Sequence, residues 1–277
     1  MRKRIIEVAN ISDTGRKRPH NEDSSVTDAG LGLAIVADGM GGYKAGEVAS
    51  AIAVQMILDD MHAALGRGGA KVHVDEITGL SRASIALRDA VARANAEVYR
   101  TAQEVPQCQG MGTTIVAVLY CGDKVSIAHV GDSRVYRLQG DEFTQITRDH
   151  SLIQELIDRG FFTPEEAAEN TPKNLVTRAL GIELNVEVDI QERDAMAEEI
   201  YLLCSDGLND MVDDEEIHLT LSKYSANLFE AATELIRLAN ENGGKDNVSV
   251  VLVRPQATAP RTTGLVAKLN SFLKRSS

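Results

Sequence analysis

The stretch LGLAIVADGMGG at residues 31–42 constrains the fold of this chain more than any other. An apolar run at 33–37, rich in β-branched residues, stops at Asp38 and at glycines, and a run so short is typical of a buried strand. The glycines lack Cβ atoms, so we expect the chain to turn there with positive φ and to bring its carbonyls close to a bound ion; they are Gly39, Gly41 and Gly42. The stretch therefore predicts a carboxylate at the end of a buried strand. Taken alone, it fits an ordinary strand, turn and helix with a capping Asp as well.

The composition is that of a globular protein. The 277 residues are 43% hydrophobic, enough for a sizeable core in one large domain or two smaller ones. The formal charge of −12, from 41 acidic and 29 basic residues, repels nucleic acid and anionic membranes, and we find no compensating basic patch in the body of the chain. The N-terminal MRKRIIEVAN has an apolar segment too short for a secretory signal or a membrane span. We therefore expect a cytoplasmic protein that binds no nucleic acid.

The cysteines match no zinc or redox pattern. There are three, Cys108, Cys121 and Cys204, and no two of them form a CxxC pair. The last two end strand-like apolar runs. We expect all three to be small core residues and not catalytic thiols.

The first half of the chain predicts a strand, two helices and then a change of period. A strand is expected at 5–13, and a basic, turn-forming stretch, TGRKRPHNED, follows it. Apolar residues at helical spacing predict helices over 44–65 and 81–103, the first with Val48 on its apolar stripe. From Gly110 onward the short runs TTIVAVLY, KVSIAHV and RVYRL predict an antiparallel meander.

The second half interrupts the strands and then resumes them. An irregular helical insertion at 149–180 is expected to cover part of the surface, with a small core of its own around Phe161 and Phe162. A strand ending in Asp206 repeats the earlier junction, and a core-facing helix at 225–240 leads to a last strand after GGKDN. Beyond Arg254, PQATAP reads as a linker and residues 264–275 as a short basic amphipathic helix.

Carboxylates recur where strands end or turns begin. The set is Glu22, Asp23, Asp38, Asp132, Asp206 and Asp246. Each one separately fits a turn or cap residue, but if they converge they repel one another and need multivalent cations to neutralise them. All-oxygen ligation without clustered His or Cys favours Mg²⁺ or Mn²⁺ over zinc.

The order and wording of the motifs make this pattern specific. They are RPHNED at 18–23, DGMGG at 38–42, GMGTT at 110–114, GDSR at 131–134, SDGL at 205–208 and KDN at 245–247. In this order they resemble the type 2C protein phosphatases, the metal-dependent PPM family of serine/threonine phosphatases, in its bacterial form. The resemblance covers about residues 5–254.

The resemblance implies a fold of the α+β class. This is a four-layer α-β-β-α sandwich with two central antiparallel sheets and a helical flap insertion. We expect a catalytic domain at 1–254, its flap at 149–180, and a linker with a short basic amphipathic tail at 255–277.

The resemblance also implies roles for individual residues. Asp38 is expected to bridge two cations, with Asp206 and Asp246 on one ion and Glu22 and the Gly39 carbonyl on the other. A further, weaker ion is expected at Asp132. The remaining expectations are Arg18 as the phosphate-binding residue, Asp23 and Asn247 as residues that hold ligands in place, and Thr113 as a packing residue.

The implied activity is hydrolysis of phosphoserine and phosphothreonine monoesters by a metal-activated water, with two Mn²⁺ or Mg²⁺ ions and a possible third. The expected partners are phosphorylated proteins, including a cognate serine/threonine kinase; the chain is expected to be a monomer, with membrane contact limited to its tail. One departure is Met40, where animal members carry a histidine proposed as general acid, so His20 and His150 are candidate proton donors.

Two alternatives compete with the enzyme. A catalytically inactive pseudophosphatase that binds phosphoproteins would be expected to lose metal ligands, and Glu22, Asp38, Asp206 and Asp246 are all present. A calcium-binding structural protein calls for a contiguous D-x-D-x-D-G loop, which the sequence lacks.

Overall fold

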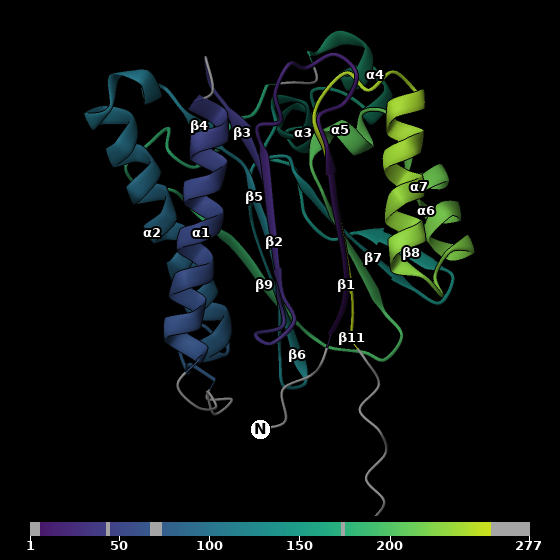
Figure 1. The fold of residues 1–277 in the computed structure, drawn as a ribbon, viewed down its shortest axis with the longest axis horizontal. Helices are drawn as coiled ribbons and strands as arrows, with labels where there is room; N and C mark the ends of the chain where they lie inside the picture. The colour runs from purple at the N-terminus through teal and green to yellow at the C-terminus, as the bar shows by residue number, and fades with distance from the viewer. Residues whose placement is uncertain (1–5, 43–44, 67–73, 173–174, 256–277) are drawn as a thin grey trace, which may run out of the picture.

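The computed structural model describes residues 6–42, 45–66, 74–172 and 175–255. Two antiparallel sheets lie face to face in the middle of the molecule (Figure 1). Helices α1 (Ala45–Leu65) and α2 (Arg82–Glu104) cover one sheet, and α6 (Asp214–Lys223) and α7 (Leu228–Glu241) cover the other. The predicted four-layer α-β-β-α sandwich is therefore confirmed.

The two sheets draw on distant parts of the chain. The first has the order β1-β11-β10-β7-β8, made of Ile6–Asp13, Val248–Pro255, Ile200–Cys204, Arg134–Gln139 and Glu142–Gln145. The second has the order β2-β3-β5-β6-β9, with β4 paired to β3, made of Asp23–Asp28, Leu33–Met40, Ile115–Cys121, Lys124–Val130, Asp189–Asp194 and, for β4, Gly112–Thr113. A 3-10 turn at Pro106–Cys108 and the short helices α3 (Leu152–Asp158), α4 (Pro164–Asn170) and α5 (Asp206–Asn209) complete the described elements.

Strand β3 is apolar throughout because both of its faces are covered. Leu33, Ile35 and Ala37 pack toward the α1 and α2 layer, whereas Ala34 and Val36 pack between the two sheets. Side chains alternate along a strand, so the next residue, Asp38, continues the face that lies between the sheets. The strand thus aims a carboxylate at one end of the inter-sheet space.

The predicted meander is wrong. β5 pairs with β6 and β7 pairs with β8, but β6 and β7 belong to different sheets, and the chain crosses between them at Gly131, which has a φ of +108°. The free edges of β6 and β7 are instead taken by the later strands β9 and β10. Local periodicity identifies strands, but it carries no information about partners from later in the chain.

The apolar stripe predicted for α1 packs in or against the core except at its first residue, Val48. Val48 is 37% exposed, while the buried face carries small residues such as Ala49 and Ala53, which let the helix approach β3 and α2 closely. Helix α1 is also long and apolar enough to cross a membrane by length and composition, but its inner face packs into the main core. We therefore interpret it as a core helix.

The flap insertion carries α3 and α4, but the core predicted for it is wrong at Phe161, which is 66% exposed. Its two ends are held together, since the Leu152 N–H donates to the Leu175 carbonyl at 2.9 Å and the Thr177 N–H donates to the His150 carbonyl at 2.8 Å. Apart from Pro255, the tail predicted at 255–277 lies outside the described residues. The division into a catalytic domain and a tail stays a prediction.

The cysteines lie in or against the core as expected. Cys108 and Cys204 are buried and Cys121 is half-buried, and all three are free thiols. Burial raises the pKa of Cys204 to about 12 and also raises that of Cys121, which disfavours the reactive thiolate at these two positions.

Candidate metal centre

Five strand ends and junctions meet at one end of the sandwich and bring the predicted carboxylates together. Asp23 opens β2 and stands opposite Asp38 of β3 in the antiparallel register. Asp132 comes from the β6–β7 crossing, Asp206 from the start of α5 after β10, and Asp246 from the loop before β11. The pKa of Asp38 is raised well above its usual range, first by burial and then by the charges of the other four acids.

The other buried acids show the same electrostatic strain. Burial raises the pKa values of Asp23 and Asp132 to about 6 each. The pKa of Asp206 is raised well above its usual value, first by burial and then by the charges of Asp132 and Asp246. One buried oxygen of Asp206, Oδ1, has no hydrogen-bond donor within the described part of the chain. Without a bound cation, the cluster therefore contains a buried oxygen that lacks a hydrogen-bond donor, and carboxylates that repel one another.

The donor set fits divalent cations. Every predicted ligand offers oxygen and none offers nitrogen or sulfur, which suits Mg²⁺ or Mn²⁺. A cation would satisfy the buried oxygen of Asp206 and remove the repulsion that raises these pKa values. The residues that the structure gathers thus match a metal centre better than a set of turn or cap residues.

Gly39 is required for a different reason than predicted. It lies in the extended strand β3, and only Gly41 of the three glycines has a positive φ, at +155°. A Cβ on Gly39 would lie 2.1 Å from the Gly46 carbonyl oxygen and 2.6 Å from that of Glu22. The glycine lets the start of α1 and the Glu22 backbone press against β3. The turn expected at Gly39 is wrong and comes instead after Met40.

Glu22 lies beside this contact. The Gly39 N–H donates to the Glu22 carbonyl at 3.1 Å, and a Cβ on Gly46 would lie 2.8 Å from Glu22 Oε1. Burial raises the pKa of Glu22, and nearby Asp246 raises it further, against the opposing charge of Arg18. Glu22 and the Gly39 backbone therefore share one side of the cluster, as the predicted ligand pair requires.

Arg18 reaches the cluster through Asp246. Its Nη2 donates to Asp246 Oδ2 at 2.6 Å, in an exposed pair that raises the pKa of Arg18. The same carboxylate receives the Asn247 N–H at Oδ1, at 2.8 Å. A guanidinium at the rim of a cation site is suited to hold a phosphoryl group by two parallel hydrogen bonds.

Asn247 and Asp23 position the loops and do not face solvent. The Asn247 side chain accepts from the Glu22 N–H at 2.8 Å and donates to the carbonyls of Thr14 and His20, so it fastens the RPHNED loop to the KDN loop. Asp23 Oδ2 accepts from the hydroxyls of Ser205 and Ser249, each at 2.7 Å. These contacts support the holding roles predicted for both residues.

Thr113 does more than pack, contrary to our expectation. Its hydroxyl donates to the Asp38 carbonyl at 2.9 Å, and β4 pairs with β3 at Gly39. The neighbouring Thr114 accepts from the Asp38 N–H with its hydroxyl at 3.0 Å and donates its own N–H to the Asp38 carbonyl at 2.9 Å. The GMGTT motif thus holds the backbone of the central aspartate. Ser205 and Ser249, which hold Asp23, were also missed, although Ser205 lies inside the SDGL motif.

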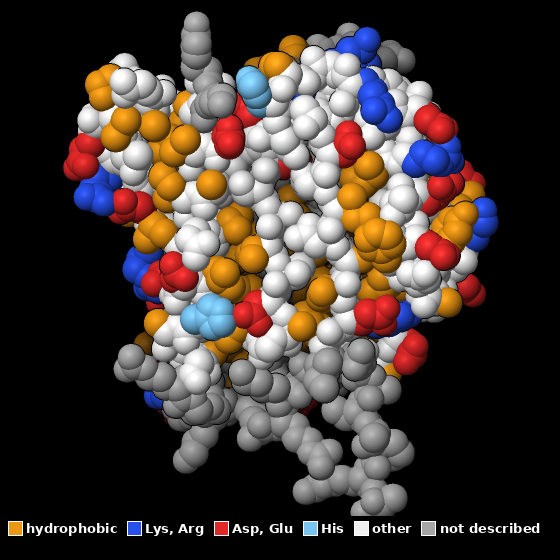
Figure 2. Space-filling view, viewed as in Figure 1, with side chains coloured by type: hydrophobic (Ala, Val, Ile, Leu, Met, Phe, Trp, Pro, Cys, Tyr) orange, Lys and Arg blue, Asp and Glu red, His pale blue; other side chains and the backbone are white. Residues whose placement is uncertain are grey.

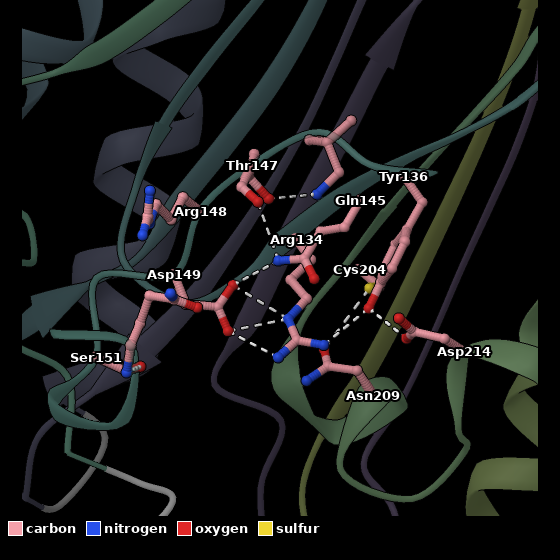
Figure 3. A network of polar contacts seen from close by, with 12 residues as sticks. Arg134, Tyr136, Gln145, Thr147, Arg148, Asp149, Ser151, Cys204, Asn209 and Asp214 are labelled. Atoms are coloured by element: carbon pink, nitrogen blue, oxygen red, sulfur yellow. Dashed lines mark hydrogen bonds and ion pairs between the residues drawn. The ribbon is translucent and has the colours of Figure 1, made fainter. Parts of the chain in front are cut away.

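Arg134 of the GDSR motif anchors the flap (Figure 3). Its guanidinium donates through Nε and Nη2 to both oxygens of Asp149, at 2.8 to 3.1 Å, and through Nη1 to the Tyr136 hydroxyl at 2.9 Å. Tyr136 in turn donates to Asp214 at the start of α6. A cavity of about 240 Å³ lies between this network and α3, and its lining includes Asp132, Asp206, Ile153 and Ile157. The first flap helix therefore borders the carboxylate cluster.

His150 is not suited to donate a proton to a substrate. Its Nδ1 accepts from the Gly131 N–H at 3.0 Å, and its Nε2 lies 3.1 Å from Arg178 Nη1, so both ring nitrogens face donors. Burial, followed by His129 and Arg178, lowers the pKa of His150 to about 4. Ligand atoms of His129, His150 and Asp189 lie within 4.8 Å of one another, but the Arg178 guanidinium already contacts two of these residues, at 2.8 Å from Asp189 Oδ1 and 3.1 Å from His150 Nε2. The trio fastens the base of the flap to the GDSR loop.

Comparison with known proteins gives the same assignment. The family model of protein phosphatase 2C matches residues 16–250. The chain is 42% identical over 252 residues to the serine/threonine protein phosphatase PstP of Mycobacterium tuberculosis, covering 90% of this chain but only 45% of that protein. It is 40% identical over 250 residues to the serine/threonine phosphatase stp of Listeria monocytogenes, covering 89% of this chain and 95% of that protein.

Solved structures agree in fold. The crystal structure of the Mycobacterium tuberculosis serine/threonine phosphatase PstP/Ppp superimposes with a TM-score of 0.80 at 38% identity, covering 91% of this chain and 99% of that one. A structure of the PstP catalytic domain in complex with two manganese ions gives a TM-score of 0.77 at 38% identity, covering 90% and 97%. The family model spans most of the chain and the relatives share its fold; the chain belongs to the protein phosphatase 2C family.

Proposed function

We propose that this protein is a metal-dependent phosphatase that hydrolyses phosphoserine and phosphothreonine monoesters in proteins. The observation that carries the proposal is the convergence of four carboxylates, with Arg18 beside them, at a place where a buried oxygen of Asp206 lacks a hydrogen-bond donor among the described residues. The four are Asp38, Asp132, Asp206 and Asp246. The relatives named as serine/threonine phosphatases and the manganese complex of one of them support it.

Each residue of the cluster has a role in this proposal. Asp38 would bridge two cations, Asp206 and Asp246 would hold one of them, and Glu22 with the Gly39 carbonyl would hold the other. Asp132 would hold a further, weaker ion. When bound, divalent cations would supply Lewis-acid activation of water and neutralise charge on the phosphoryl oxygens. The hydroxyls that contact the Asp38 backbone, those of Thr113 and Thr114, are buried and hydrogen-bonded, so water would be the attacking group.

Arg18 would orient the substrate. In the structure its guanidinium is paired with Asp246, and the pair is exposed, so the partners can exchange at small cost. With Asp246 directed to a cation, the guanidinium is free to donate two hydrogen bonds to phosphoryl oxygens. His20 is the remaining histidine candidate for protonating the leaving group, and its exposed position on the RPHNED loop allows this.

The remaining features of the proposal follow from the family. We propose Mn²⁺ or Mg²⁺ as the cofactor, a cognate serine/threonine kinase among the phosphorylated partners, a monomeric state and a cytoplasmic location. The test is phosphate release from phosphothreonine, phosphoserine and phosphotyrosine peptides with Mn²⁺, with Mg²⁺ and with chelator. Hydrolysis of the first two that requires metal supports the proposal, and binding of phosphopeptides without turnover would favour the pseudophosphatase instead.

A further inference from the structure

Three exposed cationic side chains lie on the two loops that carry Arg18 and its partner Asp246, namely Arg16, Lys17 and Lys245, here called the cationic rim. Two interlocked loops bring them together. The Arg16 N–H donates to the Gly244 carbonyl at 2.7 Å, and a Cβ on Gly244 would lie 2.7 Å from Arg16 Cγ. Lys245 immediately precedes Asp246, the partner of Arg18. No basic patch is evident in the sequence of the body, because Lys245 lies far from the RKR run at 16–18 along the chain.

The cationic rim differs from most of the other basic residues in the described ranges. Within the described ranges most Arg and Lys side chains form an ion pair with Asp or Glu, as Arg88, Arg134 and Arg254 do. The three rim residues form no such pair among the described residues. Basic and acidic side chains lie side by side at the upper right edge of the molecule, around the end of α7 (Figure 2), where Arg237 pairs with Glu234 and Glu241.

Grouped cations without acid partners repel one another, and a chain with 41 acidic residues has ample acids to neutralise them. The rim is also placed where a substrate chain would pass. Lys17 is next to Arg18 in the chain, and Lys245 is next to Asp246, the ion-pair partner of Arg18. A peptide whose phosphoryl group is held by Arg18 would therefore present its neighbouring residues to the rim.

We infer that the cationic rim binds anionic groups on residues that flank the phosphorylated residue. The preferred substrates would carry Asp or Glu beside the phosphoresidue, and a second phosphoryl group presents the same chemistry at higher charge. The inference rests on the proposed phosphatase function and adds a substrate preference to it. If the inference holds, substitutions in the cationic rim should change the KM for peptides but not the KM for a small aryl phosphate, which has no flanking residues.

The experiment compares three phosphothreonine peptides of one sequence, with flanking Glu, with flanking Gln, and with a second phosphothreonine in place of a Glu. The enzymes are the wild type, the Lys17→Ser/Lys245→Ser variant, and the control Arg82→Ser. Arg82 is exposed and without an ion pair among the described residues, and it begins α2, which packs against the far end of α1. Helix α1 spans 21 residues from the metal centre, on the order of 30 Å.

The wild type should have a lower KM for the Glu and doubly phosphorylated peptides than for the Gln peptide. The rim variant should raise KM for the two anionic peptides by roughly two- to tenfold. In the rim variant, the ratio of kcat/KM for the anionic peptides to kcat/KM for an aryl phosphate should fall. In the Arg82→Ser control, the same ratio should equal that of the wild type. The inference would be overturned if the rim variant lost as much kcat/KM on the Gln peptide and the aryl phosphate as on the anionic peptides. Such a uniform loss would show an effect on Arg18 and not on the recognition of flanking residues.

Ionic strength provides a second measurement that needs no variant. Added salt should raise the wild-type KM for the Glu peptide more than for the Gln peptide, since exposed charge pairs are screened. Identical salt dependence for the two peptides would also overturn the inference. If the wild type released no phosphate from any substrate, the proposed function would fail, and this outcome is distinct from activity without an acidic preference.

Discussion

Asp23 and Asp38 lie directly opposite each other on the neighbouring antiparallel strands β2 and β3. Like charges in such a pair destabilise a sheet, and here burial raises the pKa of both carboxyls. Two hydroxyls stabilise Asp23 from the other sheet, but Asp38 also faces Asp206, Asp132 and Asp246. Divalent cations would offset the repulsion between these carboxylates, and the oxygen ligands suit such ions.

The metal-free protein should therefore become more stable as the pH falls. Asp23 has a folded pKa of about 6 against an unfolded value near 4, so the folded state binds more protons between these values and loses that advantage as the pH rises through 6. Asp38, Asp132 and Asp206 act in the same direction, whereas His129 and His150, whose pKa values burial lowers, oppose it as the pH falls through 6.5. Because the four acids outnumber the two histidines, in chelator we expect Tm to be higher at pH 5.5 than at pH 7.5. Saturating Mn²⁺ should raise Tm most at pH 7.5. A metal-free Tm that rises with pH over this range would contradict the account of the cluster.

Replacing Thr113 should impair the metal centre without emptying it. Thr113→Val removes the hydroxyl that donates to the Asp38 carbonyl but keeps the shape of the side chain. We expect a loss of about 1 kcal/mol in the free energy of unfolding. We also expect a fall of roughly tenfold or more in kcat, because residues that orient metal ligands have effects of that size. Thr113→Ser retains the hydroxyl and should recover most of the activity. Equal activity in the Val and Ser variants would return Thr113 to a packing role.

Asp132→Asn should weaken binding of the proposed third ion and leave binding of the first two ions unchanged. Asp132 comes from the β6–β7 crossing and lines the cavity beside α3, apart from the strand pair of Asp23 and Asp38. We expect kcat and kcat/KM to fall together while calorimetry still finds two tightly bound Mn²⁺ ions. A variant with wild-type kcat at every Mn²⁺ concentration would make Asp132 a structural residue of the junction.

The flap should govern protein substrates more than the chemical step. Its ends are held together by hydrogen bonds between Leu152 and Leu175 and between His150 and Thr177, so a short Gly-Ser linker can replace the residues between 153 and 174. We expect the shortened enzyme to keep hydrolysis of aryl phosphate and to lose selectivity among phosphoproteins. Its folding and metal content should be checked first. Loss of aryl phosphate turnover in a folded, metal-loaded protein would show that α3 takes part in the chemistry.

The sequence predicted the ends of strands better than their partners. The run before Asp38 and the stripe of α2 identify buried elements because burial dictates local residue types. The crossing at Gly131 depends on β9 and β10, which come more than 50 residues later, so local patterns could not predict it. The acids of the cluster were found because each stands at a strand end or a turn, within motifs of a characteristic order. The hydroxyls of Thr114, Ser205 and Ser249 were missed because a buried serine or threonine shows no pattern until its partner is known.

The central claim is that Asp38 and its neighbouring acids form a metal centre that hydrolyses phosphothreonine. The most direct measurement is phosphate release from a phosphothreonine peptide as Mn²⁺ is titrated into metal-free wild type and Asp38→Asn, with calorimetry on the same samples. We predict wild-type turnover that appears only with metal and disappears in chelator. In Asp38→Asn we predict a loss of roughly 10²- to 10³-fold together with weakened Mn²⁺ binding. Full turnover in chelator, or wild-type turnover in Asp38→Asn, would contradict the claim.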